Sequence, residues 1–125
     1  MTNEGILKKL LTKAEQLGWV IVQNDEEDVC SYSYEFIYLV DTQEFGIYIS
    51  TENDPSKFLD NLYKIADDFD ISYETYLWLD ETGHGDKGAP KDMRDVYGNV
   101  KYFWEFIKET YAELRKLYLK TLQED

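Results

Sequence analysis

Residues 29–41, VCSYSYEFIYLVD, alternate between two kinds of side chain, and this alternation decides the fold class. Large aromatic or branched residues fall on one face and a mixed set falls on the other: Tyr32, Tyr34, Phe36, Tyr38 and Val40, against Ser31, Ser33, Glu35, Ile37 and Leu39. A period of two with this composition predicts a β-strand that has one face fully buried and the other partly buried.

Two shorter segments beside this strand complete a predicted sheet. Residues 19–24, WVIVQN, are a short apolar run that ends at the acidic cluster 25–28, which is typical of a strand followed by a turn. After a tight connection at residues 42–44, the segment 45–50, FGIYIS, repeats the alternation. Three consecutive strands with short connections predict an antiparallel meander.

Helical periodicity precedes and follows the three strands. Apolar residues recur every three or four positions over residues 6–17, and Gly18 is placed to end that helix. A second helix is expected from Pro55 to Phe69, because Asp54 is a good N-cap and proline is favoured at the first helical position.

Two more helices are expected in the rest of the chain. Ser72 supplies half of a capping box for a short third helix that ends near Glu81, and the glycine-rich segment 82–90 predicts a loop. The apolar stripe of residues 96–118 predicts a C-terminal helix of about six turns, with Gly98 placed to interrupt it near its start.

The predicted order α-β-β-β-α-α-α defines an α+β fold, a three-stranded antiparallel sheet with helices packed on one face. At 125 residues, with 43% hydrophobic and 16% aromatic content, the chain is expected to form a single folded domain over residues 1–125.

The charge of the chain is confined to its middle. The formal net charge is −13, and residues 24–86 hold 17 acidic residues against two lysines, whereas both ends are nearly balanced. A surface that only needed to be soluble would not require this asymmetry, so we expect it to contact a basic partner.

The sequence also predicts a compartment and excludes some roles. Its single cysteine, Cys30, cannot form an internal disulfide, and residues 1–11 lack the pattern of a signal peptide. No apolar run approaches the length of a membrane span. We therefore expect a protein of the bacterial cytoplasm that binds neither membranes nor nucleic acid directly, because its acidic surface repels both.

Candidate partner-binding residues lie in the segment 67–86. Acidic side chains there gather at the expected ends of the second and third helices, where they oppose the helix dipole and so suggest a compensating partner. Tyrosines beside them offer contact area of the kind found at binding hot spots. The predicted set is Asp67, Asp68, Asp70, Tyr73, Glu74, Tyr76, Asp80, Glu81, His84 and Asp86. For each tyrosine, a place in the core is the alternative interpretation.

Catalytic and metal sites are the weaker interpretations of the same segment. His84 has no second histidine or nearby cysteine for zinc, and the loop lacks the calcium-loop spacing. A pair formed by Cys30 and His84, or acid–base work by the aspartates at 67, 68 and 70, matches no local signature, and the glycines at 83, 85 and 88 lack the phosphate-loop spacing. We expect no enzyme activity, no cofactor and no metal.

Residues 68–97, DFDISYETYLWLDETGHGDKGAPKDMRDVY, resemble the C-terminal half of small acidic proteins of unknown function from phages and conjugative elements of gut bacteria. The resemblance rests on Asp68, Phe69, Asp70, Glu74, Trp78, Gly88, Ala89, Pro90 and Val96, followed by a long amphipathic helix. It implies a mobile-element setting and no catalytic residues. As a class, small acidic proteins of mobile elements resemble anti-CRISPR and anti-restriction inhibitors.

Together, the charge pattern and the resemblance predict a non-enzymatic, acidic anti-defence inhibitor. It would bind the basic surface of a host defence nuclease as a DNA mimic, because DNA carries one charge per 1.7 Å of helix axis. Two alternatives stay open, an immunity or antitoxin-like protein that neutralises one toxin, and a small hydrolase that uses His84, Asp80 or Cys30.

Overall fold

The structure, a computed structural model, describes residues 2–25, 32–51 and 53–124, and within them the elements follow the predicted order. Their bounds are α1 (Asn3–Leu17), β1 (Val20–Asp25), β2 (Tyr32–Val40), β3 (Gln43–Thr51), α2 (Pro55–Asp68), α3 (Ile71–Leu77) and α4 (Met93–Gln123). The α+β prediction is confirmed. The predicted strand residues 29–31 and Cys30 lie outside the described ranges.

The three strands form an antiparallel sheet in the order β1-β2-β3. β2 is central, and its Phe36 stands opposite Ile21 of β1 and Ile47 of β3. The tight connection between β2 and β3 is shorter than predicted, because Asp41 and Thr42 alone form it. Asp41 takes a positive φ of 54°, which lets a two-residue turn follow the twist of the strands.

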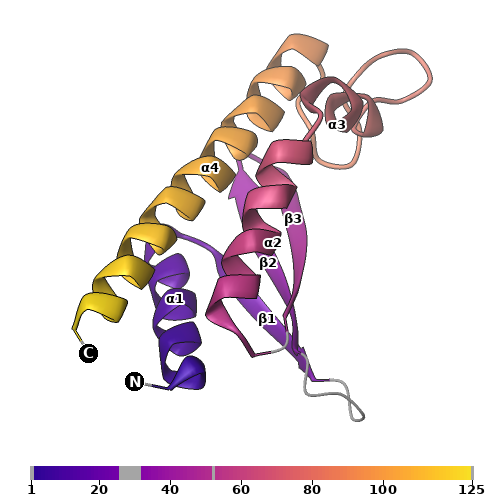
Figure 1. Cartoon of the computed structure of the whole chain (residues 1–125). Helices are drawn as coiled ribbons and strands as arrows, with labels where there is room; N and C mark the ends of the chain where they lie inside the picture. The colour runs from indigo at the N-terminus through magenta and orange to yellow at the C-terminus, as the bar shows by residue number, and fades with distance from the viewer. Residues whose placement is uncertain (1, 26–31, 52, 125) are drawn as a thin grey trace.

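The helices lie on one side of the sheet, as predicted (Figure 1). α4 runs the length of the molecule, with α1 and α2 packed next to each other along the same side of it and α3 beside its N-terminal half. The opposite face of the sheet carries no helix, and three large apolar side chains there are well exposed: Val20 (61%), Leu39 (60%) and Tyr48 (66%).

Trp19 is the centre of the core where α1 ends and the sheet begins. Gly18 ends α1 with a φ of 123°, and the next residue, Trp19, is almost fully buried. Its ring makes edge contacts with Phe36 and Phe106, and its Nε1–H donates a hydrogen bond to Oγ1 of Thr110 in α4 (2.9 Å). One side chain therefore joins the sheet to the last helix.

Two helix predictions needed correction. α3 begins after Asp70 rather than at Ser72, and it ends at Leu77 rather than near Glu81. α4 has 31 residues, or about eight to nine turns, and it continues through Gly98 without interruption. Glycine lowers helix stability but does not forbid a helix, and the buried stripe of α4 outweighs its cost.

The connection between α3 and α4, residues 78–92, is exposed but well ordered by its own backbone. Leu79 and Gly85 form an isolated antiparallel bridge within it, and the Gly85 N–H donates to the Lys91 carbonyl (3.0 Å). Near its second half, the connection contacts the β2–β3 turn, because Oγ1 of Thr42 donates a hydrogen bond to the Gly88 carbonyl.

None of the helices within the described ranges is long and apolar enough to cross a bilayer.

Candidate functional site

The predicted acidic residues of α2 and α3 occupy two different local environments. Asp67 and Asp68 are the last two residues of α2, so they oppose the helix dipole there as expected. Asp70, by contrast, is the N-cap of α3, where its Oδ1 accepts a hydrogen bond from the Tyr73 N–H (3.1 Å). The prediction that Asp70 opposes a helix dipole is wrong, because a carboxylate at an N-terminus is favourable.

Asp80 is also held by the structure rather than left uncompensated. Because α3 ends at Leu77, Asp80 and Glu81 lie beyond its C-terminus, in the connection. Oδ1 of Asp80 accepts hydrogen bonds from Oγ1 of Thr82 (2.6 Å), the Thr82 N–H (2.8 Å) and the His84 N–H (3.1 Å). The Thr82 hydroxyl first, and then the His84 N–H, lower the pKa of Asp80. This carboxylate has a structural role in the turn.

His84 shares the hydroxyl of Thr82 with Asp80. The Nδ1 atom of His84 lies 2.7 Å from Oγ1 of Thr82. Because the Thr82 hydroxyl donates its hydrogen bond to Oδ1 of Asp80, its oxygen is left to accept one from Nδ1 of His84. His84 is exposed, and the residues described by the structure contain no group of three side chains suited to a metal ion.

The tyrosines of α3 project into solvent. Tyr73 is 57% exposed and Tyr76 is 70% exposed, whereas Tyr34 on β2 is buried, so both of the roles expected for tyrosine occur. Tyr97 and Tyr102, at the N-terminal half of α4, are about half exposed as well. Aromatic contact area is thus available beside Asp68, Asp70 and Glu74 without being required by the core.

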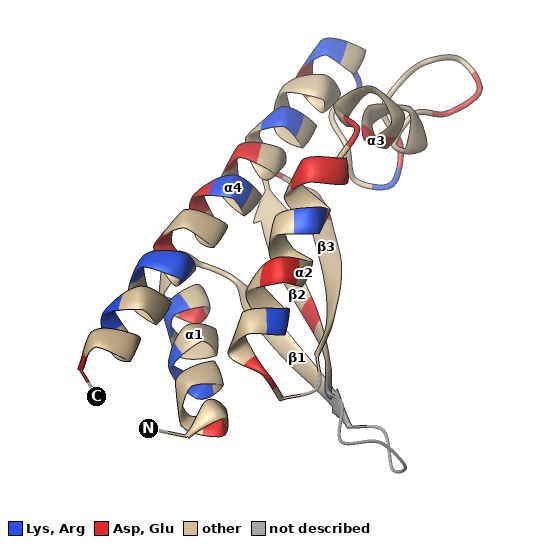
Figure 2. Ribbon diagram, viewed as in Figure 1, with Lys and Arg blue, Asp and Glu red and all other residues tan. Residues whose placement is uncertain are grey.

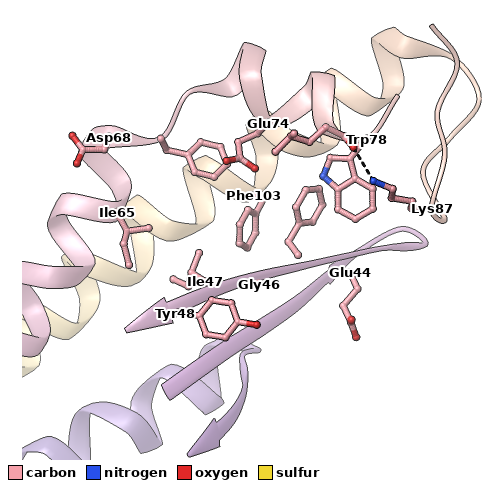
Figure 3. A pocket seen from close by; sticks show the side chains of 13 residues that line it. Glu44, Gly46, Ile47, Tyr48, Ile65, Asp68, Glu74, Trp78, Lys87 and Phe103 are labelled. Atoms are coloured by element: carbon pink, nitrogen blue, oxygen red, sulfur yellow. Dashed lines mark hydrogen bonds between the residues drawn. The ribbon is translucent and has the colours of Figure 1, made fainter. Parts of the chain in front are cut away.

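A groove lies between β3 and the α2–α3 corner (Figure 3). Its volume is about 520 Å³, and residues from five parts of the chain line it: Glu44, Phe45, Gly46, Ile47, Tyr48, Ile65, Asp68, Phe69, Glu74, Leu77, Trp78, Lys87 and Phe103. The structure brings Asp68 and Glu74 of the predicted set to this groove. Asp80, Glu81, His84 and Asp86 lie on the connection instead, outside the lining.

Glu74 is the carboxylate that points into the groove (Figure 3). Burial first, and then the charge of Asp70, raise the pKa of its carboxyl group. Among the described residues, no side chain or backbone donor pairs with it. A partly buried carboxylate with no cation is uncompensated, and such groups often mark binding sites.

The aromatic lining of the groove was not predicted from the sequence. Phe45 stacks on Phe103 with ring centroids 4.7 Å apart, and Trp78 packs against Phe45 at 5.2 Å. Each of these residues resembles an ordinary core residue in the sequence. The predicted meander makes β3 an edge strand, as observed, but it does not say which helices lie beside that edge.

The charges are separated between parts of the fold (Figure 2). Nine of the 13 basic residues lie on α1 and α4, whereas residues 33–86, outside position 52, carry 12 acidic residues against Lys57 and Lys64. The end of α2, α3 and the following connection are therefore mainly acidic, and α4 is mixed. The acidic excess of the middle block is therefore carried by different elements from those that hold most of the basic residues.

No family model, no curated protein and no solved structure matches the chain.

Proposed function

We propose that this protein is a non-enzymatic inhibitor whose acidic side binds the basic, nucleic-acid-binding surface of a bacterial defence nuclease, as anti-CRISPR and anti-restriction proteins do. The observation that carries the proposal is the uneven balance of charge: carboxylates outnumber lysines and arginines on α2, α3 and the connection 78–92, whereas lysines and arginines outnumber carboxylates on α1 and α4.

The separation favours binding over solubility alone because of its physical cost. Asp67 and Asp68 lie at the C-terminal end of α2, where a negative charge opposes the helix dipole, and each such charge costs about a few tenths of a kcal/mol in stability. Carboxylates that lie on one surface also repel one another. Such a surface steers the molecule toward positively charged clefts and accelerates its association with them. A nucleic-acid-binding cleft is such a surface, and the mimic would compete with DNA for it.

A second candidate function, an immunity or antitoxin-like protein, is favoured by the uncovered face of the sheet. Val20, Leu39 and Tyr48 expose apolar surface there that no helix of the described chain covers. An apolar interface of this kind suits a tight and permanent complex with one toxin.

The two candidates differ in how binding responds to salt. The protein would be immobilised and used to capture partners from a lysate of bacteria with active defence systems, at about 50 and 300 mM NaCl, a span over which exposed charge pairs weaken markedly. We expect the protein to capture a nuclease at the lower salt concentration, and we expect added duplex DNA to displace this nuclease. A partner that resists both salt and DNA would instead identify the immunity-type interface.

Charge reversal gives the matched control for this experiment. The double substitution Asp67→Lys and Asp68→Lys should abolish capture at the lower salt concentration. Glu105→Lys and Glu109→Lys, which reverse two exposed charges on α4, should leave capture intact. Equal loss in both variants would contradict a specific role for the acidic side.

A further inference from the structure

The groove runs along a free edge of the sheet. Val40 and Gln43 flank the two-residue turn and stand opposite each other, so they exchange the first pair of hydrogen bonds between β2 and β3. Because bonded and non-bonded pairs alternate, the odd-numbered residues of β3 bond to β2. The N–H and C=O groups of Glu44, Gly46 and Tyr48 therefore point to the free edge.

One hydrogen bond and one absence support this assignment. The Ser50 carbonyl, which the same alternation directs outward, accepts a hydrogen bond from Nδ2 of Asn61 in α2 (3.1 Å). Within the described ranges, no backbone group outside the sheet bonds to Glu44, Gly46 or Tyr48. α2 thus closes one end of the edge, and about 14 Å of it stays open at a rise of roughly 3.4 Å per residue.

The side chains around the edge show that the groove is entered from the edge rather than from one face. Phe45 and Ile47 line it from the helix side of the sheet, and Glu44 and Tyr48 line it from the open side. Gly46 lies between them with no side chain, as is common where another backbone approaches a strand closely.

The charges of the groove favour a basic occupant. Glu44, Asp68 and Glu74 line it against a single cation, Lys87. The Lys87 ammonium lies 3.4 Å from the Leu77 carbonyl, at the α3 end, and it does not pair with Glu74. Trp78 and Phe69 also line the groove, and aromatic rings can contact the stem or guanidinium of an arginine.

We infer that this groove binds an extended segment of a partner protein, of about five residues, which adds to β3 as a fourth strand and places a lysine or arginine side chain against Glu74. The inference rests on the proposed function, since it names the part of the basic partner that the acidic side would hold.

A second copy of the chain fits this role poorly. The segments 20–25, 32–40 and 43–51 contain no lysine or arginine, so no strand of the chain could supply the cation. The free edge of β3 is itself recessed beneath the α2–α3 corner, which blocks the approach of an identical recessed edge.

Peptide binding to the isotope-labelled protein tests the inference directly. The probe is a capped seven-residue peptide in which arginine and valine alternate. At saturation we expect hydrogen exchange at the Gly46 and Tyr48 amides to slow by about tenfold or more, because both amides gain hydrogen bonds. A peptide with glutamate in place of arginine, and one with every amide N-methylated, should not bind.

Two protein variants separate the backbone contribution from the charge contribution. Tyr48→Pro removes an outward N–H and keeps the bonds to β2, a position at which edge strands tolerate proline, so it should weaken peptide binding by about tenfold relative to Tyr48→Ala. Glu74→Gln should weaken binding of the arginine peptide by a similar factor.

Unchanged exchange at Gly46 and Tyr48 on peptide binding, or equal binding of the glutamate peptide, would overturn the inference. The proposed function fails separately: a salt-sensitive nuclease that binds Tyr48→Pro and Tyr48→Ala equally would leave the acidic inhibitor in place and refute strand addition. If the protein binds the peptide but captures no nuclease, strand addition would stand and the proposed function would be refuted.

Discussion

Two glycines of the α3–α4 connection that look alike in sequence have opposite surroundings in the structure. A Cβ on Gly83 would meet nothing within 4 Å, although its φ of 82° disfavours other residues. A Cβ on Gly85 would lie 1.7 Å from the Pro90 carbonyl oxygen. Gly85 is therefore required by packing and Gly83 only by conformation.

Alanine at these two positions should destabilise the protein to different degrees. Gly83→Ala should cost about 1 kcal/mol in the free energy of unfolding, the cost of a left-handed alanine. Gly85→Ala should cost about 2–3 kcal/mol, as overpacking does, because the connection must move. Urea denaturation of both variants measures the difference, and equal losses would show that the Gly85–Pro90 contact can relax freely.

Glu74 lowers the stability of the folded protein as pH rises, whereas a carboxylate paired with a cation raises it. Its folded-state pKa is raised, so the native state holds the proton more tightly and this group reduces stability as pH rises from its unfolded pKa through its folded pKa. Glu74→Gln should therefore raise the free energy of unfolding at pH 7 and should change little at pH 4.

Denaturation curves for Glu74→Gln and the parent protein across this range provide the measurement. Asp80→Asn is the control of opposite sign: the pKa of Asp80 is lowered, so its contribution to stability is present above its unfolded pKa and is lost as pH falls through its folded pKa. A stabilising effect of Glu74→Gln that stays constant with pH would contradict the assignment.

Among the elements, α4 shows how local propensity and tertiary packing compete. Gly98 is exposed within the helix, and an added Cβ would meet no atom within 4 Å. Its helical conformation is maintained by the buried residues on the opposite stripe, including Val96, Val100 and Phe103.

Alanine at Gly98 should raise the free energy of unfolding by about 1 kcal/mol, because it removes the entropic cost of glycine without a clash. This corresponds to an increase of a few degrees in Tm for a domain of this size. Ala112→Gly, at an exposed position later in α4, should lower stability by a similar amount. Thermal unfolding by circular dichroism measures both, and a destabilised Gly98→Ala would indicate a role for the glycine beyond the helix.

The elements also show what the sequence could and could not predict. The alternation of β2 and β3 and the cap formed by Asp54 and Pro55 are local signals, so the strands, α1 and α2 were predictable. The end of α3 was not, because Asp80 bonds to its own turn rather than extending the helix. The groove was not predictable either, since it depends on how the α2–α3 corner is placed beside the free edge of β3.

At the scale of the whole molecule, the separation of charge should make stability depend on ionic strength. A net charge of −13, with the excess of carboxylates in residues 24–86, produces repulsion that salt screens. Raising NaCl from about 0.02 to 0.3 M should therefore raise Tm. Asp67→Asn with Asp68→Asn should raise Tm at low salt and reduce the gain from salt, since both charges also oppose the dipole of α2.

Neutral substitutions on the mixed surface of α4 provide the comparison. Glu105→Gln with Glu109→Gln removes two carboxylates that lie among Lys101 and Lys108 in sequence, so the salt dependence of Tm should stay near that of the parent. Differential scanning calorimetry at several salt concentrations would measure all three proteins. An equal change for both pairs would mean that total charge, and not its location, sets the stability.

The hydrogen bond from Trp19 to Thr110 joins positions 91 residues apart. During translation, the sheet and α2 would leave the ribosome well before Thr110 does, and until then the Trp19 ring would have no partner from α4. Full burial of Trp19 thus has to wait for α4, and the growing chain would expose part of its aromatic core to chaperones until α4 emerges. Substitutions in α4 should consequently reduce the yield of folded protein in cells more than their effect on the finished molecule suggests.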